Sequence, residues 1–317
     1  MPRPRKELID LSATPYYHVY SRCVRRAYLC GSDPETGVSY EHRKQWLEER
    51  MRLLASIFTV TICAYTVMSN HYHIVVHINP EEAQKWTDAE VLVRWRCLYK
   101  GSKLIQRHIR NESLSSSELK EVWATISDYR RKLTSLSWFM KALNEPIARM
   151  ANQEDECSGH FWESRFNSRA LRTRAALLAC MAYVDLNPVR AGVVSDPNHS
   201  PYTSFPRRQS DRFNTIGAIN RQIDSSALRA FPIDLKPLMP FSDLQFSCQS
   251  NDPPRLPFST SEYGELIEWT HQHDGKRDKD RNECAKPTLL EHMGISINNW
   301  LIQSSFFELL YKIGVYQ

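Results

Sequence analysis

The sequence lacks the patterns that mark several classes of protein. Its 8 cysteines are scattered and form no Cys-x-x-Cys pair, which argues against a zinc site built from close cysteine pairs and against a disulfide framework. Reduced cytosolic thiols are the plain interpretation. Segment 1–10 is charged without an apolar core, unlike a signal peptide, and no apolar run approaches the roughly 20 residues that cross a bilayer. We therefore expect a soluble, cytoplasmic protein with no membrane partner.

A strong excess of one charge is also missing. The 41 Lys and Arg against 36 Asp and Glu give a formal net charge of +5. This balance permits a nucleic-acid partner without requiring one, because a local basic patch matters more than the total. The 317 residues are enough for one large domain or two modest ones, and we find no internal repeat.

The first two thirds of the chain carry alternating strand patterns and helical patterns. Pro15–Arg22 is predicted to be a strand with His18, Tyr20 and Arg22 on one face. Two further β-rich runs are separated by only a few residues, so they can pair as a hairpin. The remaining predicted elements are a helix over Glu41–Phe58, the paired strands Phe58–Val67 and His71–Ile78, a helix over Leu136–Gln153, a strand over Arg165–Leu171, and a helix that Thr173 caps and that Pro188 and Gly192 end.

Three segments lie outside this pattern. Residues 81–137 are polar and charged, and we predict a helical insertion with a loop around Asn111–Ser117. Residues 206–258 are rich in Pro and Ser and are predicted to be an irregular connector. Residues 259–317 regain helical patterning, with Ser259 and Glu262 as a capping box. A small helical bundle is favoured there over a helix-turn-helix DNA reader at Leu289–Tyr311.

The pair His71 and His73 is the first candidate for chemistry. Side chains alternate along a strand, so both imidazoles project from one face, roughly 7 Å apart along the backbone. Two such imidazoles can hold a divalent metal, whereas a half-exposed structural pair is the plainer alternative. His77 shares the face, but at four residues from the pair it is interpreted as structural.

Tyr183 is the second candidate. It lies four residues before Asn187, so on a helix both side chains occupy one face, beside an apolar stripe that would fix the helix against a sheet. A nucleophile on a packed helix with an oxygen ligand one turn away is a sensible catalytic arrangement. The alternative is a tyrosine at the edge of the core, followed by Asn187-Pro188 as a helix stop.

Four motifs taken together resemble those of the REP-associated tyrosine transposases, a branch of the single-tyrosine HUH transposases. They occur in the family's order over roughly residues 13–205, with the last as the most specific. They are Tyr17–Arg22, Tyr65–His73, Phe161–Phe166 and Tyr183–Gly192. The resemblance implies a catalytic domain over 1–205, with residues 81–137 and about 110 residues after the last motif as departures from the compact family pattern.

Carried over residue by residue, the resemblance makes Tyr183 the nucleophile and His71, His73 and Asn187 the ligands of a divalent metal, Mg²⁺ or Mn²⁺. Asn187 is the weaker assignment because some relatives use Gln there. The implied activity cuts and rejoins single-stranded or hairpin DNA, in the bacterial nucleoid, through a 5′-phosphotyrosine. The implied fold is α+β, a ferredoxin-like antiparallel sheet flanked by helices, with the helical insertion and a mainly helical C-terminal extension.

Basic and aromatic side chains beside the motifs are candidates for contacts with DNA phosphates and bases. The expected DNA-binding residues are Arg22, Arg25, Arg26, Phe161, Trp162, Arg165, Arg169, Arg172 and Arg174, with Tyr16 and Tyr20 among them. Two rivals remain open: a catalytically silent DNA-hairpin-binding protein derived from a transposase, and an unrelated metallohydrolase. Both a monomer and a homodimer are compatible with the sequence. The resemblance implies that in a dimer the helix with Tyr183 can serve the partner's metal site, and whether Tyr183 acts in cis or in trans stays open.

Overall fold

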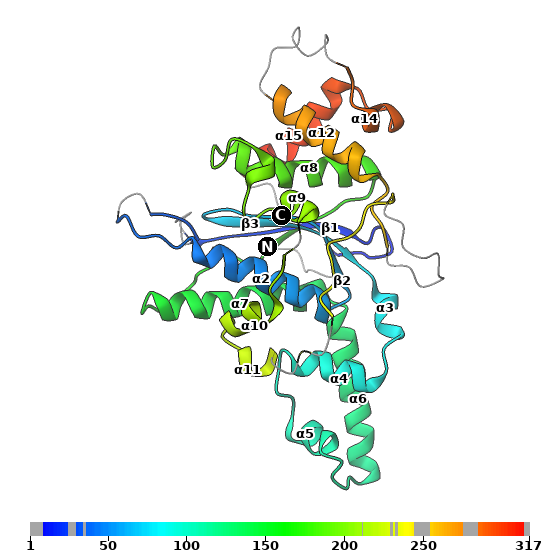
Figure 1. Cartoon of the computed structure of the whole chain (residues 1–317). Coiled ribbons are helices and arrows are strands. Elements are labelled where there is room, and N and C mark those ends of the chain that lie inside the picture. Colours follow the sequence, from blue (N-terminus) through cyan, green and yellow to red (C-terminus); the bar gives the residue numbers. More distant parts are fainter. Residues whose placement is uncertain are drawn as a thin grey trace.

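A four-stranded antiparallel sheet forms the centre of the protein (Figure 1). The computed structural model describes residues 9–24, 30–33, 36–210, 212–228, 231, 234–243, 254–274 and 285–313. The strands are β1 (Tyr16–Arg22), β2 (Val60–Val67), β3 (His71–Ile78) and β4 (Asn167–Ala170), in the order β2-β3-β1-β4. With α2 (His42–Ile57) before β2 and α7 (Leu136–Glu154) before β4, this is the βαββαβ arrangement of a ferredoxin-like sheet. The predicted fold class is confirmed.

The two central elements follow directly from the sequence. All eight residues of β2 are buried, as expected of a near-continuous apolar run covered on both faces. The turn to β3 is closed by the amide of Met68, which donates to the carbonyl of His71 at 2.8 Å. The predicted hairpin is therefore confirmed, and so are the strand at β1 and the helices α2 and α7.

Helices cover both faces of the sheet (Figure 1). On one face α2 and α7 pack over Tyr17, Val19 and Tyr72. On the other face lies α8 (Arg174–Arg190), which is itself covered by α12 (Thr260–His273), α14 (Thr288–His292) and α15 (Ile297–Ile313). We call α12, α14 and α15 the C-terminal helices. They continue the hydrophobic core of α8, so the C-terminal extension completes the second face of the sheet.

The ends of α8 and α12 show how local sequence sets the helix boundaries. Thr173 caps α8 by accepting the amide of Ala176 at 3.1 Å, as predicted. As predicted, α8 ends between Pro188 and Gly192: Pro188 lies in the last turn, Arg190 is the last helical residue, and Gly192 follows at a φ of +69°. The capping box of Ser259 and Glu262 is present at the start of α12.

The insertion after β3 is helical, as predicted. It consists of α3 (Pro80–Gln84), α4 (Asp88–Arg96), α5 (Lys103–Ile109) and α6 (Ser116–Leu133), and it projects from the face of the sheet that α2 and α7 cover (Figure 1). The segment 206–258 is more helical than the expected irregular connector. Its short helices are the end of α9 (Ser204–Gln209), α10 (Thr215–Arg221) and α11 (Ser225–Leu228), and η2 (Pro197–His199) precedes the segment.

Ion pairs with α2 hold α10 and α11 in place, and the local sequence pattern does not predict these pairs. Arg221 binds Glu49 at 2.9 Å, and Arg50 binds Asp224 at 2.8 Å. Such partners lie far apart in the sequence, so proline and serine content alone underestimated the order of the segment. Within the described part of the chain, no helix has the length and apolar character that crossing a membrane requires.

Candidate functional site

The candidate site lies between the sheet and α8. Strand alternation places His18 of β1 and His71 and His73 of β3 on the face that α8 covers. Arg22 stands opposite His71 in the pairing of β1 with β3, at the end of the two strands. Tyr183 reaches the same face from α8. The structure therefore brings together both predicted histidines and the predicted nucleophile.

Three side chains form a hydrogen-bonded chain in this layer. The hydroxyl of Tyr183 is 3.3 Å from Nε2 of His73, and Nδ1 of the same ring is 3.0 Å from Nε2 of His18. The rings of His18 and His73 are stacked, with centroids 5.1 Å apart. All three side chains have an exposed fraction of 0%. His73 is thus held from both of its ring nitrogens, and one of them faces the phenol.

The environment keeps these histidines neutral. Burial lowers the pKa of His18 to about 3, with a smaller contribution from Arg169. Burial also lowers the pKa of His71 to about 3, helped by the nearby charge of Arg22. For His73, burial and then the neighbouring His71 and His18 hold the pKa well below its usual range. Neutral imidazoles have a lone pair, which is the form that binds metals and accepts protons.

The imidazoles of His71 and His73 are suitable ligands for a divalent metal, with one condition. The rings of His71 and His73 have centroids 4.9 Å apart on one strand face. His71 is fixed by a 2.6 Å contact between its Nδ1 and Oδ1 of Asn70, an arrangement typical of metal-binding histidines. The condition concerns His73, because its Nε2 faces the hydroxyl of Tyr183 and a metal at that nitrogen would have to displace the phenol.

Asn187 lies one turn after Tyr183 on α8 and is 9% exposed. Within the described residues its side chain makes no hydrogen bond, and none joins it to either imidazole. The same part of the chain contains no group of three or more His, Cys, Asp and Glu side chains that is arranged to hold a metal. A site here would combine two histidines with the amide oxygen of Asn187.

The C-terminal helices seal this layer. Phe307 of α15 stacks against Tyr183 with ring centroids 5.8 Å apart, and its edge contacts His18 at 5.6 Å. The guanidinium of Arg169 lies over the ring of Phe307 at 5.7 Å. Arg190 ties α15 to the end of α8 by donating to the carbonyl of Ser304 at 2.8 Å. In this conformation neither DNA nor a solvated ion reaches the phenol.

The predicted DNA-binding residues divide into three groups. Arg22 and Arg169 border the site on β1 and β4, and their charges act on His71 and His18. Arg165, Arg172 and Arg174 are exposed, between the end of α7 and the start of α8. Arg25 and Arg26 lie outside the described residues.

Phe161 and Trp162 belong to an aromatic cleft of about 640 Å³ between α7 and segment 159–166. Phe161 is only 3% exposed, so it supports the wall of the cleft and does not offer a ring face to a base. Trp162 borders the cleft, donates to the carbonyl of Asn144 at 2.9 Å and packs edge-on against Tyr72. Because the amide of Glu163 donates to the carbonyl of Arg22 at 2.9 Å, the cleft adjoins the end of the sheet that carries His71.

Two residues of this layer were not anticipated. His18 was assigned to the correct face of its strand, yet its contact with His73 follows from β1 pairing directly with β3, which the sequence alone does not specify. Phe307 belongs to an apolar helical pattern that is indistinguishable in sequence from that of an ordinary core helix. Neither residue carries a local motif, and only the three-dimensional pairing shows its place in the site.

Comparisons with known proteins give one distant likeness. No family model matches the chain, and no curated protein matches its sequence. Among solved structures, a REP-associated tyrosine transposase bound to a REP hairpin is similar over 68% of this chain and 90% of the other, with 15% identity and a TM-score of 0.34. This score is too low to equate the two folds, so the case for a function rests on the motifs and on the site itself.

Proposed function

We propose that this protein is a DNA strand-transfer enzyme of the single-tyrosine type, in which Tyr183 becomes covalently linked to DNA. The observation that carries the proposal is the contact between the Tyr183 hydroxyl and Nε2 of His73, with His71 beside it on the same strand face. A phenol that faces a neutral, buried imidazole has a proton acceptor in place.

The reaction follows from this arrangement. The phenolic oxygen of Tyr183 attacks a DNA phosphorus, and the bond between phosphorus and the 3′ oxygen breaks. The phenolic proton passes to Nε2 of His73, or to water in the metal-bound form, in which that nitrogen would be a ligand. The leaving oxygen takes up a proton and becomes a free 3′-OH, and the 5′ side stays attached as a phosphotyrosine. The ester is retained, so a second 3′-OH can reverse the step and join strands without ATP.

A divalent metal, Mg²⁺ or Mn²⁺, would be held by His71, His73 and Asn187. Bound there, it would neutralise negative charge on the phosphate oxygens. The neutral state of the two histidines and the fixed orientation of His71 favour such binding. Since Nε2 of His73 faces the phenol here, the metal-bound form requires Tyr183 to swing away from His73, with Asn187 on the same helix face.

The substrate proposed is single-stranded or hairpin DNA. A buried, helix-borne tyrosine cannot reach a phosphate inside a regular duplex, so the strand must enter unpaired. Arg22 and Arg165, near the end of the sheet that carries His71, would contact its phosphates, and Trp162 borders a cleft next to the site. Arg172, which lies near Tyr17 at the other end of β1, and Arg174 would contact a more distant part of the strand. Action on chromosomal repeats would place the protein at the bacterial nucleoid. A homodimer in which Tyr183 serves the partner remains part of the proposal alongside a monomer.

The test incubates the protein with Mn²⁺ and end-labelled hairpin oligonucleotides that carry single-stranded flanks. We expect a covalent DNA–protein adduct on denaturing gels and a DNA-linked peptide that contains Tyr183. Tyr183→Phe should abolish the adduct, because phenylalanine has no nucleophile. The matched control is Tyr202→Phe, a half-buried tyrosine outside the site, which should keep it. Undiminished adduct with Tyr183→Phe would sink the assignment.

The complete burial of Tyr183, His73 and His18 favours one alternative, a catalytically silent protein that binds DNA hairpins. In that case hairpins would shift the protein on native gels without any adduct. The alternative predicts no adduct even after the contact of Phe307 is removed, so the Phe307→Ala variant separates the two functions.

A further inference from the structure

The insertion carries a basic stretch that the proposed chemistry does not use. Residues 91–111 contain no Asp or Glu, while Lys and Arg recur through them. The cations of this stretch are Arg94, Arg96, Lys100, Lys103, Arg107 and Arg110. This run of one sign, from within α4 through α5, is more concentrated than the net charge of +5 on the whole chain would give.

Three of these cations line one cleft. Arg96, Lys100 and Arg110 border a hollow of about 540 Å³ between α4, α5 and α11, together with Gln106 and Ser226. All three cations are exposed. Glu112 pairs with both Arg110 and Arg107. No carboxylate of the described residues pairs with Arg96 or Lys100. We call this the insertion surface, defined by Arg96, Lys100 and Arg110.

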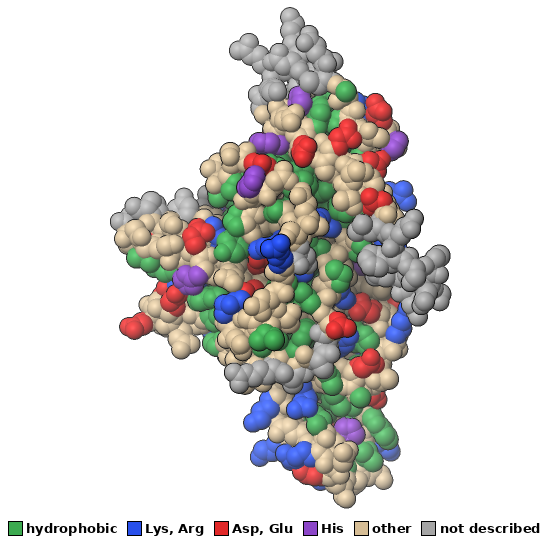
Figure 2. All heavy atoms as spheres, viewed as in Figure 1, with side chains coloured by type: hydrophobic (Ala, Val, Ile, Leu, Met, Phe, Trp, Pro, Cys, Tyr) green, Lys and Arg blue, Asp and Glu red, His purple; other side chains and the backbone are tan. Residues whose placement is uncertain are grey.

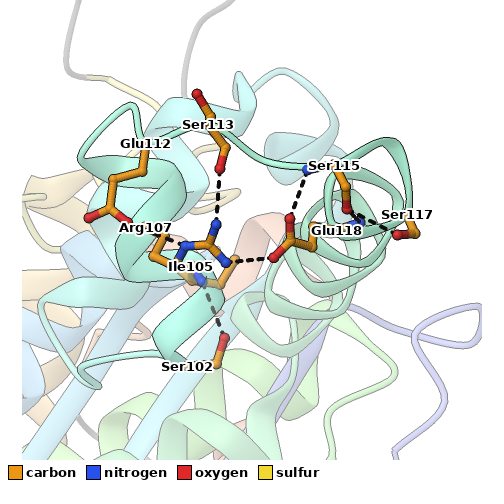
Figure 3. A network of polar contacts seen from close by, with 8 residues as sticks. All are labelled: Ser102, Ile105, Arg107, Glu112, Ser113, Ser115, Ser117 and Glu118. Carbon is orange, nitrogen blue, oxygen red and sulfur yellow. Dashed lines mark hydrogen bonds and ion pairs between the residues drawn. The ribbon is translucent and has the colours of Figure 1, made fainter.

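Arg107 fixes the geometry of the insertion surface (Figure 3). Its guanidinium contacts Glu118 at 2.5 Å and Glu112 at 3.3 Å and donates to the carbonyl of Ser113 at 2.9 Å. Glu118 in turn completes the capping box of α6 with Ser115. The turn from α5 to α6 is therefore tied to both helices, and the exposed cations project from a fixed support.

The insertion surface lies far from the tyrosine. Figure 1 shows α5 at one end of the molecule and α8 beyond the sheet, on its opposite side. In Figure 2, Lys and Arg side chains gather on the part of the molecule that the insertion forms. Nucleotides bound at Tyr183 cannot therefore be the ones that contact Arg96 and Lys100.

We propose that the insertion surface binds the phosphate backbone of double-stranded DNA, namely the stem of the hairpin whose unpaired strand enters the site. The proposal rests on the proposed function, since it names the part of the same substrate that the insertion holds. Cations joined by polar side chains in an open cleft suit the sequence-independent contacts that position a duplex.

Single-stranded DNA fits the insertion surface less well. Binding of unpaired strands relies on aromatic rings on which bases stack. The aromatic residues of the basic stretch are committed to packing: Trp95 is stacked on Tyr129 with centroids 4.2 Å apart, and Tyr99 contacts Trp95 at 4.9 Å. No aromatic side chain lines the described cleft. The surface therefore has the charge that a duplex needs without the rings that a single strand needs.

The experiment compares two double variants of the full-length protein. Arg96→Gln/Lys100→Gln removes two cations of the insertion surface, and Lys120→Gln/Arg131→Gln removes two exposed cations from α6 with the same change in net charge. Affinity is measured over a range of salt concentrations for two hairpins with identical unpaired flanks. One has a short stem, and the other has a stem long enough to extend across the molecule.

We expect the unmodified protein to bind the long stem more tightly. Arg96→Gln/Lys100→Gln should weaken that binding roughly tenfold and reduce the slope of log affinity against log salt by about 2, one for each lost phosphate contact. Its affinity for the short-stem hairpin should stay the same. The α6 control pair should change neither quantity.

Three results would overturn the proposal. Equal weakening by the α6 control pair would show an effect of net charge alone. Unchanged binding by Arg96→Gln/Lys100→Gln would show that the surface does not touch the stem. Competition by polyglutamate as strong as that by duplex DNA would indicate an acidic protein partner instead. Tyr183→Phe separates this proposal from the proposed function, because it abolishes the adduct but should leave the preference for long stems intact.

Discussion

At the scale of single residues, the candidate site depends on which nitrogen of His73 carries the proton. Burial keeps His18 and His73 neutral, so one proton lies in the 3.0 Å contact between their rings. If Nδ1 of His73 donates to His18, Nε2 of His73 is left with a lone pair that faces Tyr183. Only this tautomer can accept the phenolic proton or bind a metal at Nε2. We infer that His18 positions His73 in the useful state.

Replacing His18 tests this inference. His18→Ala removes the partner of Nδ1 and should slow adduct formation about 10–100-fold, with a loss of roughly 1–3 kcal/mol in unfolding free energy because a buried nitrogen is left unpaired. His18→Gln, whose amide oxygen can accept from Nδ1, should recover most of the rate. The control is His199→Gln, an exposed histidine outside the site. Equal rates for the alanine and glutamine variants would contradict the positioning role.

His77 makes a separate prediction about pH. It lies on the same strand face, 4.9 Å from the ring of Tyr16, and burial followed by the charge of Lys236 lowers its pKa from 6.5 to about 4. The unfolded chain therefore binds a proton between these values while the folded chain does not, so stability falls as the pH drops from 6.5 towards 4. His77→Gln should lessen this loss by up to about 3 kcal/mol.

Chemical denaturation at a series of pH values measures that difference. The unfolding free energy of the unmodified protein should decline relative to His77→Gln as the pH falls through this window, and the gap should be constant above pH 7. Parallel curves for the two proteins would show that His77 keeps an ordinary pKa.

At the scale of elements, periodicity predicted what local sequence controls. The strands of the hairpin, the cap at Thr173 and the capping box at Ser259 are set by neighbouring residues, and they appear as expected. The predicted end of α8 is confirmed as well, because the helix ends at Arg190, between Pro188 and Gly192. The missing amide of Pro188 falls in the last turn, where the loss of one hydrogen bond is tolerated while packing holds the helix. The failure concerns segment 206–258, whose helices are held by distant partners on α2.

Residues of the motif that contains Tyr183 also bind the C-terminal helices that bury Tyr183. These contacts cannot be predicted from the motif's sequence. Asp185 accepts from Ser204 at 2.5 Å and from Tyr263 of α12 at 2.6 Å. Arg190 binds Asp274 at 2.6 Å and the carbonyl of Ser304. An apolar stripe on one side of α8 was expected, whereas the C-terminal helices bury its other side as well. The candidate nucleophile was thus predictable, but its complete burial was not.

Phe307 provides the element-scale prediction. Removing its ring with Phe307→Ala eliminates the contacts over Tyr183 and His18, so the closed position of α15 loses stability by about 3 kcal/mol. Adduct formation should rise roughly tenfold for each 1.4 kcal/mol by which closure weakens. Ile302→Ala, at an exposed position on α15, is the control and should leave the rate unchanged. A slower rate in Phe307→Ala would mean that the ring supports the site.

At the scale of the whole molecule, the two faces of the sheet have different tasks. One face packs against α2 and α7, whose surroundings include the aromatic cleft and the insertion surface. The other face carries His18, His71 and His73 beneath α8 and the C-terminal helices. The strands form the shared layer between the two cores, because alternate residues of β1 and β3 point into each. DNA held by the insertion would therefore reach the tyrosine only by passing around the edge of the sheet.

Opening of the C-terminal helices should then accompany DNA binding, and hydrogen exchange can show it. In the free protein, amides of α15 should be protected, since the helix packs on α8 and is tied to it through Arg190. Addition of a hairpin with Mn²⁺ should accelerate exchange in α15, while amides of β3 at the centre of the sheet stay protected. Tyr183→Phe should show the same acceleration, because opening precedes chemistry. Increased protection of α15 in the complex would instead mean that DNA binds to the closed form, and the buried phenol could not then be the nucleophile.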